Sequence, residues 1–245
     1  MTVPVVVSLF DFTGVAVEPW AASGYDCYCF DIQHEGVKGY GRIKFVHWDA
    51  EDGIDPILHL LSGRRVVFVF SFTPCTDVAV SGARHFTKKL ASDPDTWNRA
   101  VRWARLAETL SETYGCPFVV ENPVSMLSTL WRRPDYIFHP SDYGWYLDPD
   151  DTHPRWPDYI PEQDAYTKRT CFWTSKSFIM PPKEPVEPML VEVRLGSGRV
   201  TKSSPFFAKL GGKSLKTKNI RSATPRGISR AVFLVNKRES HFGVT

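Results

Sequence analysis

Apolar, β-branched runs recur along the first half of the chain, separated by segments of mixed polarity. The runs occupy residues 3–10, 25–32, 43–46, 66–72 and 117–120. Continuous apolar runs are typical of strands buried on both faces, and the segments between them are long enough to form helices. The pattern therefore predicts an α/β fold with a mostly parallel sheet that helices cover on both faces.

The clearest helical period lies between residues 95 and 114. Its apolar positions recur every three to four residues, at Trp97, Val101, Ala104, Ala107 and Leu110. This spacing is that of one face of an α-helix. Gly115 follows where a left-handed C-terminal cap is expected. We predict an amphipathic helix that ends at this glycine.

The second half of the chain is less regular. Between 134 and 161, Asp, Pro, Trp and Tyr follow no sustained period, which predicts a long loop. Two short strand-like pieces, 189–195 and 198–202, flank Gly196-Ser197 and predict a hairpin. Apolar order returns at 223–236, after a segment rich in Gly, Ser and Lys.

Length and composition limit the possible classes. With 245 residues, 42% of them hydrophobic, the chain can bury one substantial core. Its first residues show no basic leader and no cleavage site, and no apolar run reaches the roughly 20 residues that span a bilayer. The five cysteines fit neither a disulfide framework nor a zinc ribbon. We expect a soluble cytoplasmic protein that binds no membrane and no metal.

The net charge of +3 is unevenly distributed. Residues 194–238 contain twelve Lys or Arg and no Asp or Glu, whereas 142–164 contain seven acids and the single base Arg155. A basic C-terminal region is typical of a surface that meets a polyanion, although a solvated, flexible surface is an alternative interpretation. The candidate phosphate contacts in this region are Lys213, Lys216 and Lys218.

A nucleotide-binding crevice is predicted after the first apolar run. That run ends in Phe10-Asp11-Phe12-Thr13-Gly14, and Pro19 follows where a helix opens. A strand, a tight glycine turn and a helix N-terminus form the usual nucleotide crevice of α/β sheets. Asp31 ends the second run and suits ribose hydroxyls, and Asp49 follows the third and suits an adenine amino group. We predict that these residues line one pocket, with an aromatic ring of Phe12 or Trp48 near the adenine.

The fourth and fifth runs lead into the chemically most informative motifs. The fourth enters Pro74-Cys75, with Gly82 seven residues after the cysteine, and the fifth ends in Glu121-Asn122. Together, and in this order, these motifs resemble those of the cytosine-C5 methyltransferase family. About fifty residues separate Cys171 from Arg221, where larger relatives hold a target-recognition domain. The chain therefore resembles a compact, phage-type branch of that family.

The chemistry of this family explains the residue types. C5 of cytosine is a poor nucleophile, so a thiolate must first add to C6, which assigns Cys75. A carboxyl group that hydrogen-bonds N3 and the exocyclic amine stabilises charge developing in the ring, which assigns Glu121. Both side chains are predicted to lie within several ångströms of each other. The resemblance further implies that Asn122 orders the catalytic loop and that Arg169 contacts the pyrimidine.

The resemblance also implies a Rossmann-like methyltransferase fold with a small C-terminal appendage, and S-adenosyl-L-methionine as methyl donor. The chain would then consist of a cofactor-binding catalytic domain (1–180), a small basic appendage as a reduced recognition region (181–220) and a returning C-terminal segment (221–245). In that segment, the Arg221-x-x-Thr224 motif predicts that Thr224 caps a helix beginning at Pro225.

The site residues that follow from these motifs form two further groups. The predicted cofactor contacts are Phe12, Thr13, Gly14, Asp31, Asp49 and Pro74. The predicted substrate contacts, besides the three lysines named above, are Ser81, Gly82 and Arg84.

The leading interpretation is C5 methylation of cytosine in DNA through a covalent Cys-C6 adduct, in the host cytoplasm if a phage encodes the protein. The acid-free basic region favours it, because such a region can track phosphates. The same chemistry on a free cytidine nucleotide or on RNA is an alternative, since the aromatic-acidic loop around Tyr143 and Trp156 could cover a small pocket. A second alternative is a catalytically silent relative that binds nucleic acid or a protein, against which the intact Cys75, Glu121 and Asn122 argue.

Overall fold

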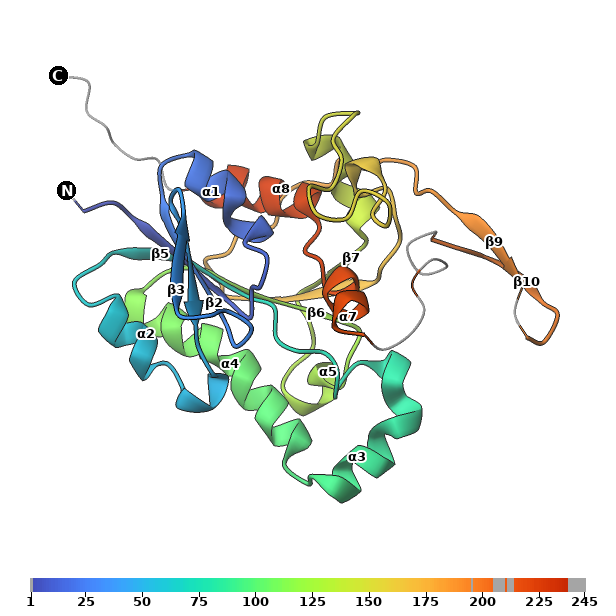
Figure 1. Cartoon of the computed structure of the whole chain (residues 1–245), viewed down its shortest axis with the longest axis horizontal. Helices are drawn as coiled ribbons and strands as arrows, with labels where there is room; N and C mark the ends of the chain where they lie inside the picture. Colours follow the sequence, from blue (N-terminus) through green and yellow to red (C-terminus); the bar gives the residue numbers. More distant parts are fainter. Residues whose placement is uncertain (1, 195, 205–209, 211–213, 238–245) are drawn as a thin grey trace.

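The structure of the chain is a computed structural model that describes residues 2–194, 196–204, 210 and 214–237. Within these residues, eight strands form one sheet in the order β3-β4-β2-β1-β5-β6-β8-β7, and two more form a separate hairpin (Figure 1). The strands of the main sheet are β1 (Val5–Leu9), β2 (Asp26–Asp31), β3 (Val37–Tyr40), β4 (Ile43–His47), β5 (Val66–Ser71), β6 (Phe118–Pro123), β7 (Tyr136–Phe138) and β8 (Thr170–Thr174).

The strands β4, β2, β1, β5 and β6 run parallel, whereas β3 and β8 are antiparallel to their neighbours β4 and β6. From β1 the chain moves to β2 and β4 on one side, and then crosses to β5 and β6 on the other. Ligands of open α/β sheets bind outside the carboxyl ends of the strands at such a switch point. The predicted mostly parallel α/β sheet is confirmed, and its arrangement is compatible with a Rossmann-like fold.

Helices cover both faces of this sheet. Alternate residues of β1 enter two apolar cores: Val5 and Val7 pack in the core that includes α2 and α4, and Val6 in the core that includes α1 and α8. Figure 1 shows α4 on one side of the sheet and α1 with α8 on the other. The α-helices are α1 (Glu18–Ala22), α2 (Asp55–Leu60), α3 (Phe86–Ser92), α4 (Thr96–Tyr114), α5 (Leu127–Leu130), α7 (Leu215–Arg221) and α8 (Arg226–Asn236).

Several local predictions are confirmed. Helix α4 ends at Gly115, which adopts the left-handed conformation with φ 62°, and Pro19 lies in the first turn of α1. The predicted hairpin forms between β9 (Val191–Arg194) and β10 (Val200–Ser203), which pair antiparallel and project from the molecule (Figure 1). Among the described helices, none has the length and apolarity needed to cross a membrane.

The prediction of an irregular segment over 134–161 was only partly right. Strand β7 and a 3-10 helix over Pro140–Tyr146 lie within it. The 3-10 helix packs against α8. This contact stabilises it without a periodic pattern in its own sequence, so the helix could not be predicted locally.

The prediction that Thr224 caps α8 was wrong. The helix begins at Arg226, and its N-cap residue Pro225 is extended (φ −64°, ψ 131°) with no side-chain cap bond. Instead, the backbone N–H of Gly227 donates to Oδ2 of Asp164 at 2.9 Å. A carboxylate from a distant loop thus takes the place of the predicted local cap.

Candidate active site

Cys75 lies in the loop that follows β5, at the carboxyl edge of the parallel strands. Its carbonyl oxygen accepts hydrogen bonds from the N–H groups of Val78 and Ala79, at 3.2 and 2.9 Å, which fold the loop into a turn. The loop also pairs with the segment after β6, because Val80 N–H donates to Val124 and Met126 N–H donates to Val78. The position of the half-buried Cys75 thiol is therefore set by both strands.

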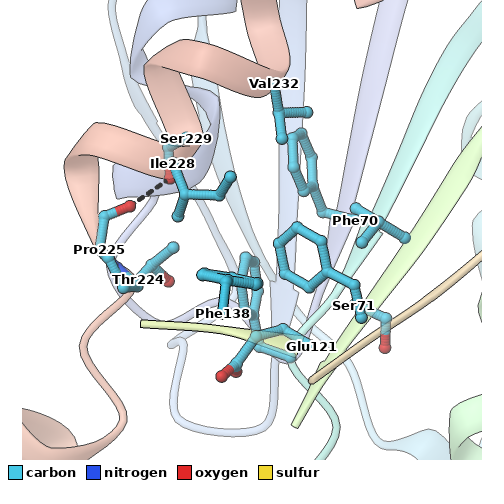
Figure 2. Close-up of a pocket in the computed structure, with 12 residues that line it drawn as sticks. Phe70, Ser71, Glu121, Phe138, Thr224, Pro225, Ile228, Ser229 and Val232 are labelled. Carbon is cyan, nitrogen blue, oxygen red and sulfur yellow. Dashed lines mark hydrogen bonds between the residues drawn. The ribbon is translucent and has the colours of Figure 1, made fainter. Parts of the chain in front are cut away.

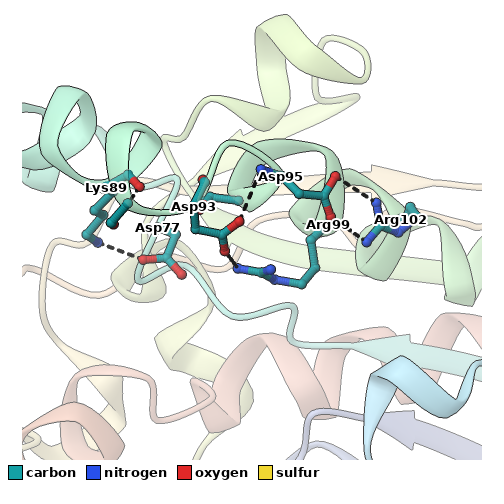
Figure 3. Close-up of polar contacts among 8 residues, drawn as sticks. Asp77, Lys89, Asp93, Asp95, Arg99 and Arg102 are labelled. Atoms are coloured by element: carbon teal, nitrogen blue, oxygen red, sulfur yellow. Dashed lines mark hydrogen bonds and ion pairs between the residues drawn. The ribbon is translucent and has the colours of Figure 1, made fainter.

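A second set of contacts fixes the far side of the same loop. The Lys89 ammonium on α3 donates to the carbonyl of Thr76 at 2.6 Å and to the carboxylate of Asp77 at 2.7 Å. Figure 3 shows this ion pair beside those that tie Asp93 to Arg99 and thereby α3 to α4. The loop after Cys75 is thus anchored to the helical layer.

Glu121 lies on β6, the strand next to β5, and points into a partly buried environment. Its Oε1 atom is buried and has no hydrogen-bond partner within the described residues. The nearest cation is Lys168, whose Nζ lies 3.7 Å from that oxygen, and both side chains are only 12% exposed. Lys168 precedes β8. This strand pairs antiparallel with β6, and Phe172 on β8 lies opposite Glu121.

These groups act on one another electrostatically. Burial raises the pKa of the Cys75 thiol above its ordinary value, the Lys168 ammonium lowers this pKa, and the Glu121 carboxylate raises it. Since burial has the largest effect, the resting thiol is protonated at neutral pH. The arrangement brings together a nucleophile, a carboxylate and a cation, and forming the thiolate requires help from that cation.

The two remaining catalytic candidates lie in contrasting environments. Asn122 is fully buried, and its Nδ2 donates to the carbonyl of Thr73 at 2.6 Å. Arg169 is exposed, and its guanidinium lowers the pKa of Cys171 on β8, although burial still raises that pKa to about 11. The sequence motifs predicted Arg169 as the residue that contacts the pyrimidine. They did not point to its neighbour Lys168, which lies beside Glu121.

A small cavity adjoins Glu121 between the sheet and α8. Its volume is about 10 Å³, which is room for roughly one water molecule. Figure 2 shows Glu121 and Phe138 at one end of it, and Thr224, Ile228 and Val232 along the side of α8. The cavity is too small for a nucleobase.

The glycine turn after β1 is organised by Asp11, a role that sequence analysis missed. Oδ1 of this buried carboxylate accepts the N–H groups of Thr13 and Gly14, at 3.0 and 2.7 Å. An Asp side chain that accepts backbone N–H groups two and three residues later is a common local signal for a turn. Gly14 adopts φ 74°, a left-handed conformation that favours glycine, and a Cβ there would lie 3.0 Å from the Phe45 ring, a tight contact.

A cavity of about 250 Å³ opens beside this turn. Phe12 lines it and stacks on His34 with ring centres 5.8 Å apart. Arg155 lines it from the loop of 147–165, since its Nη2 donates to the carbonyl of Thr13 at 3.0 Å. Gln33 and Glu35 lie on its rim and supply polar groups. An aromatic ring, hydrogen-bonding groups and a cation therefore surround a single cavity.

Of the predicted cofactor residues, Phe12 lines this cavity, whereas Thr13, Gly14, Asp31, Asp49 and Pro74 do not. Asp31 ends β2 and accepts the N–H of Gln33 at 2.8 Å; burial raises its pKa. Asp49 follows β4 and accepts the N–H of Glu51. Both are at the carboxyl ends of neighbouring parallel strands.

Trp48 is buried and donates to Gly53, so it belongs to the core. Pro74 is exposed next to Cys75.

The predicted substrate contacts lie on the surface. Ser81 and Arg84 are exposed and Gly82 is half-buried, all in the 3-10 helix over Val80–His85 that follows the Cys75 loop. Lys216 and Lys218 are exposed on α7, and the Lys216 ammonium lies 5.6 Å from the ring centre of Tyr159. Lys213 lies outside the described residues.

Comparisons with known proteins add no family assignment. No protein-family model matches the sequence, and no curated protein matches it significantly. Within the described residues, no three His, Cys, Asp or Glu side chains are grouped so that they could hold a metal ion.

Proposed function

We propose that this chain is an S-adenosylmethionine-dependent cytosine-C5 methyltransferase that acts on DNA. The observation that carries the proposal is the convergence of Cys75, Glu121 and Lys168 from three strand ends at the carboxyl edge of the parallel strands. A thiol beside a carboxylate is the pair that addition to a cytosine ring requires. The resemblance of the Pro74-Cys75 and Glu121-Asn122 motifs to those of the family supports the same reaction.

In this mechanism the Cys75 sulfur adds to C6 of the cytosine and raises the electron density at C5. Glu121 hydrogen-bonds N3 and the exocyclic amine, which stabilises the charge that develops in the ring. S-adenosylmethionine, when bound, supplies the electrophilic methyl group to C5. Transfer of the C5 proton to water and departure of the Cys75 thiolate from C6 then restore the aromatic ring.

The residues around the glycine turn fit the cofactor. Phe12 offers a ring face to a purine, Arg155 offers a cation to a carboxylate, and Gln33 offers hydrogen bonds to hydroxyl groups. The cavity lies at the end of β1, next to the switch point, where α/β sheets hold nucleotides. Asp31 at the end of β2 remains the candidate for the ribose hydroxyls.

The DNA substrate is supported by charge. The acid-free basic stretch 194–238 contains the exposed lysines of α7 and, on the hairpin of β9 and β10, the exposed Arg194 and Lys202. Phosphates flank a flipped base on both sides, so a basic surface that reaches them would favour a polynucleotide over a mononucleotide.

The decisive experiment uses S-adenosylmethionine with a deuterated methyl group. The protein is incubated separately with duplex DNA, RNA and free cytidine nucleotides, and digests are examined by mass spectrometry for labelled 5-methylcytosine. We expect label in DNA, its loss in Cys75→Ser, and its retention in Cys116→Ser, a buried cysteine just before β6 at the opposite edge. Cofactor binding by calorimetry should survive Cys75→Ser.

Label confined to nucleotides or RNA would replace the DNA substrate by that alternative. If no substrate is labelled and no S-adenosylmethionine binds, the methyltransferase proposal fails. Retained turnover in Cys75→Ser would remove this thiol from the mechanism.

A further inference from the structure

The ion pair between Lys168 and Glu121 leaves the hydrogen-bonding capacity of the buried Glu121 oxygen unused. At 3.7 Å the two atoms are too far apart for a hydrogen bond, yet both side chains are almost excluded from solvent. Glu121 Oε1 keeps its full capacity to accept a hydrogen bond within the described part of the chain. Lys168 thus compensates the charge of Glu121 without occupying the lone pairs that a base would need.

The same ammonium is also the cation that acts on the nucleophile. The charged groups that act on Cys75 are Lys168, Glu121 and Asp77. The carboxylate of Asp77 is engaged by Lys89 on α3, and that of Glu121 faces Lys168. Of these charges, Lys168 alone favours the thiolate, and it lies just before β8, in a segment far in sequence from the loop that carries Cys75.

We propose that Lys168, rather than Arg169, is the positioning residue of this site: it stabilises the Cys75 thiolate as it forms and neutralises Glu121 before substrate binds. This inference rests on the proposed function, because in that mechanism the Cys75 thiolate is the form that adds to C6 of the cytosine ring. A lysine suits the role, since its compact charge can serve two anions in turn, whereas the planar guanidinium of arginine is adapted to a bidentate partner.

Thiol alkylation tests the proposal without any methyl donor or DNA. The full-length protein is treated with iodoacetamide from pH 6 to 10, and the rate at Cys75 is followed by the mass of its peptide, which separates it from the four other cysteines. Because the thiolate is the reacting form, the rate reports the thiol pKa. Lys168→Met should lower the rate at pH 7.5 by about tenfold, because loss of the cation raises the pKa of the thiol and leaves less thiolate.

Three further variants distinguish a charge effect from a structural one. Lys168→Arg should restore most of the rate, because the positive charge returns. Glu121→Gln should change the rate in the opposite direction and increase it, because a nearby negative charge is removed. Arg169→Met, the same truncation one residue away, should leave the pH profile of Cys75 close to that of the wild type.

An unchanged profile in Lys168→Met, or a shift in Arg169→Met instead, would overturn the proposal. If Lys168→Met does not fold, a near wild-type rate in Lys168→Arg together with a faster rate in Glu121→Gln still decides it, and failure of Glu121→Gln to accelerate alkylation counts against it. Alkylation shifts without methyl transfer to any substrate would uphold the role of Lys168 and reject the proposed function. Methyl transfer with no alkylation shift would uphold the proposed function and reject the role of Lys168.

Discussion

Asn122 on β6 donates a hydrogen bond of 2.6 Å to the backbone carbonyl of Thr73, a residue 49 positions earlier in the chain. Asn122 is fully buried and Thr73 nearly so. The bond joins the ends of two neighbouring parallel strands just before the loop that carries Cys75. It therefore couples the position of the nucleophile to that of the adjacent Glu121.

Replacing Asn122 by Ala should therefore affect stability and catalysis together. The buried Thr73 carbonyl would lose its partner, at a cost of about 1–3 kcal/mol in the free energy of unfolding. The proposed methyl transfer should slow because the loop loses its anchor. Urea unfolding and methylation rates check both effects. Asn98→Ala, the same change on the exposed face of α4, should cost less than about 0.5 kcal/mol, and an equal loss in both variants would contradict this role.

Gly14→Ala should destabilise the fold and weaken cofactor binding. The left-handed backbone conformation costs an alanine about 1 kcal/mol, and the Phe45 ring, 3.0 Å from the added Cβ, must shift slightly to make room. Gly24→Ala is a matched control, because Gly24 has φ 91° but no atom within 4 Å of the added Cβ. The difference between the two variants in urea unfolding isolates the crowding. If Gly14→Ala binds S-adenosylmethionine as well as the wild type, the turn is not part of the cofactor site.

The buried strands of this fold could be predicted because they are nearly continuous apolar runs. All five residues of β1 are buried, and so are all six of β5. Strand β3 could not be found in this way, since its four residues are exposed and it is defined only by pairing with β4. Strands β7 and β8 are short and lie in or after the irregular segment, so their pairing depends on tertiary structure.

The candidate site follows the same division. Cys75, Glu121 and Asn122 could be named because each follows or ends an apolar run. Lys168 could not, because β8 returns antiparallel to β6 and only that pairing brings its side chain to Glu121. Likewise, a local rule assigned the cap of α8 to Thr224, whereas the acceptor comes from Asp164, 63 residues before Gly227.

Reversing Lys216 and Lys218 to Glu should weaken DNA binding without changing cofactor affinity. Each lost phosphate contact should also reduce the slope of log K against log salt by about 0.9. Fluorescence anisotropy with duplex DNA at several salt concentrations measures both quantities, and calorimetry measures cofactor binding.

The matched control reverses Arg65 and Lys176. Both are exposed and lie at the opposite edge of the sheet, Arg65 just before β5 and Lys176 just after the antiparallel β8. This double variant changes the net charge equally, so an equal loss of affinity would show a general charge effect instead of a contact surface on α7.

The anchor of α8 should make stability depend on pH. Asp164 is buried and accepts the N–H of Gly227, and burial raises its pKa from 3.8 to about 6. A carboxyl group whose folded-state pKa lies above its unfolded value contributes stability below the unfolded pKa, and this contribution is lost as pH rises through the folded pKa. Stability from this group should therefore be greatest below about pH 4 and should be lost by about pH 7.

Asp164→Asn tests this directly, because the amide oxygen can still accept the Gly227 N–H but no longer ionises. The rise in pKa corresponds to about 3 kcal/mol, so the free energy of unfolding of the variant relative to the wild type should increase by up to that amount between pH 4 and pH 7. Urea unfolding at each pH measures it, and other groups such as His153 cancel in the comparison. Asp148→Asn, an exposed change in the same loop, should give a nearly constant difference. A constant difference for Asp164→Asn as well would show that its carboxyl group does not titrate in this range.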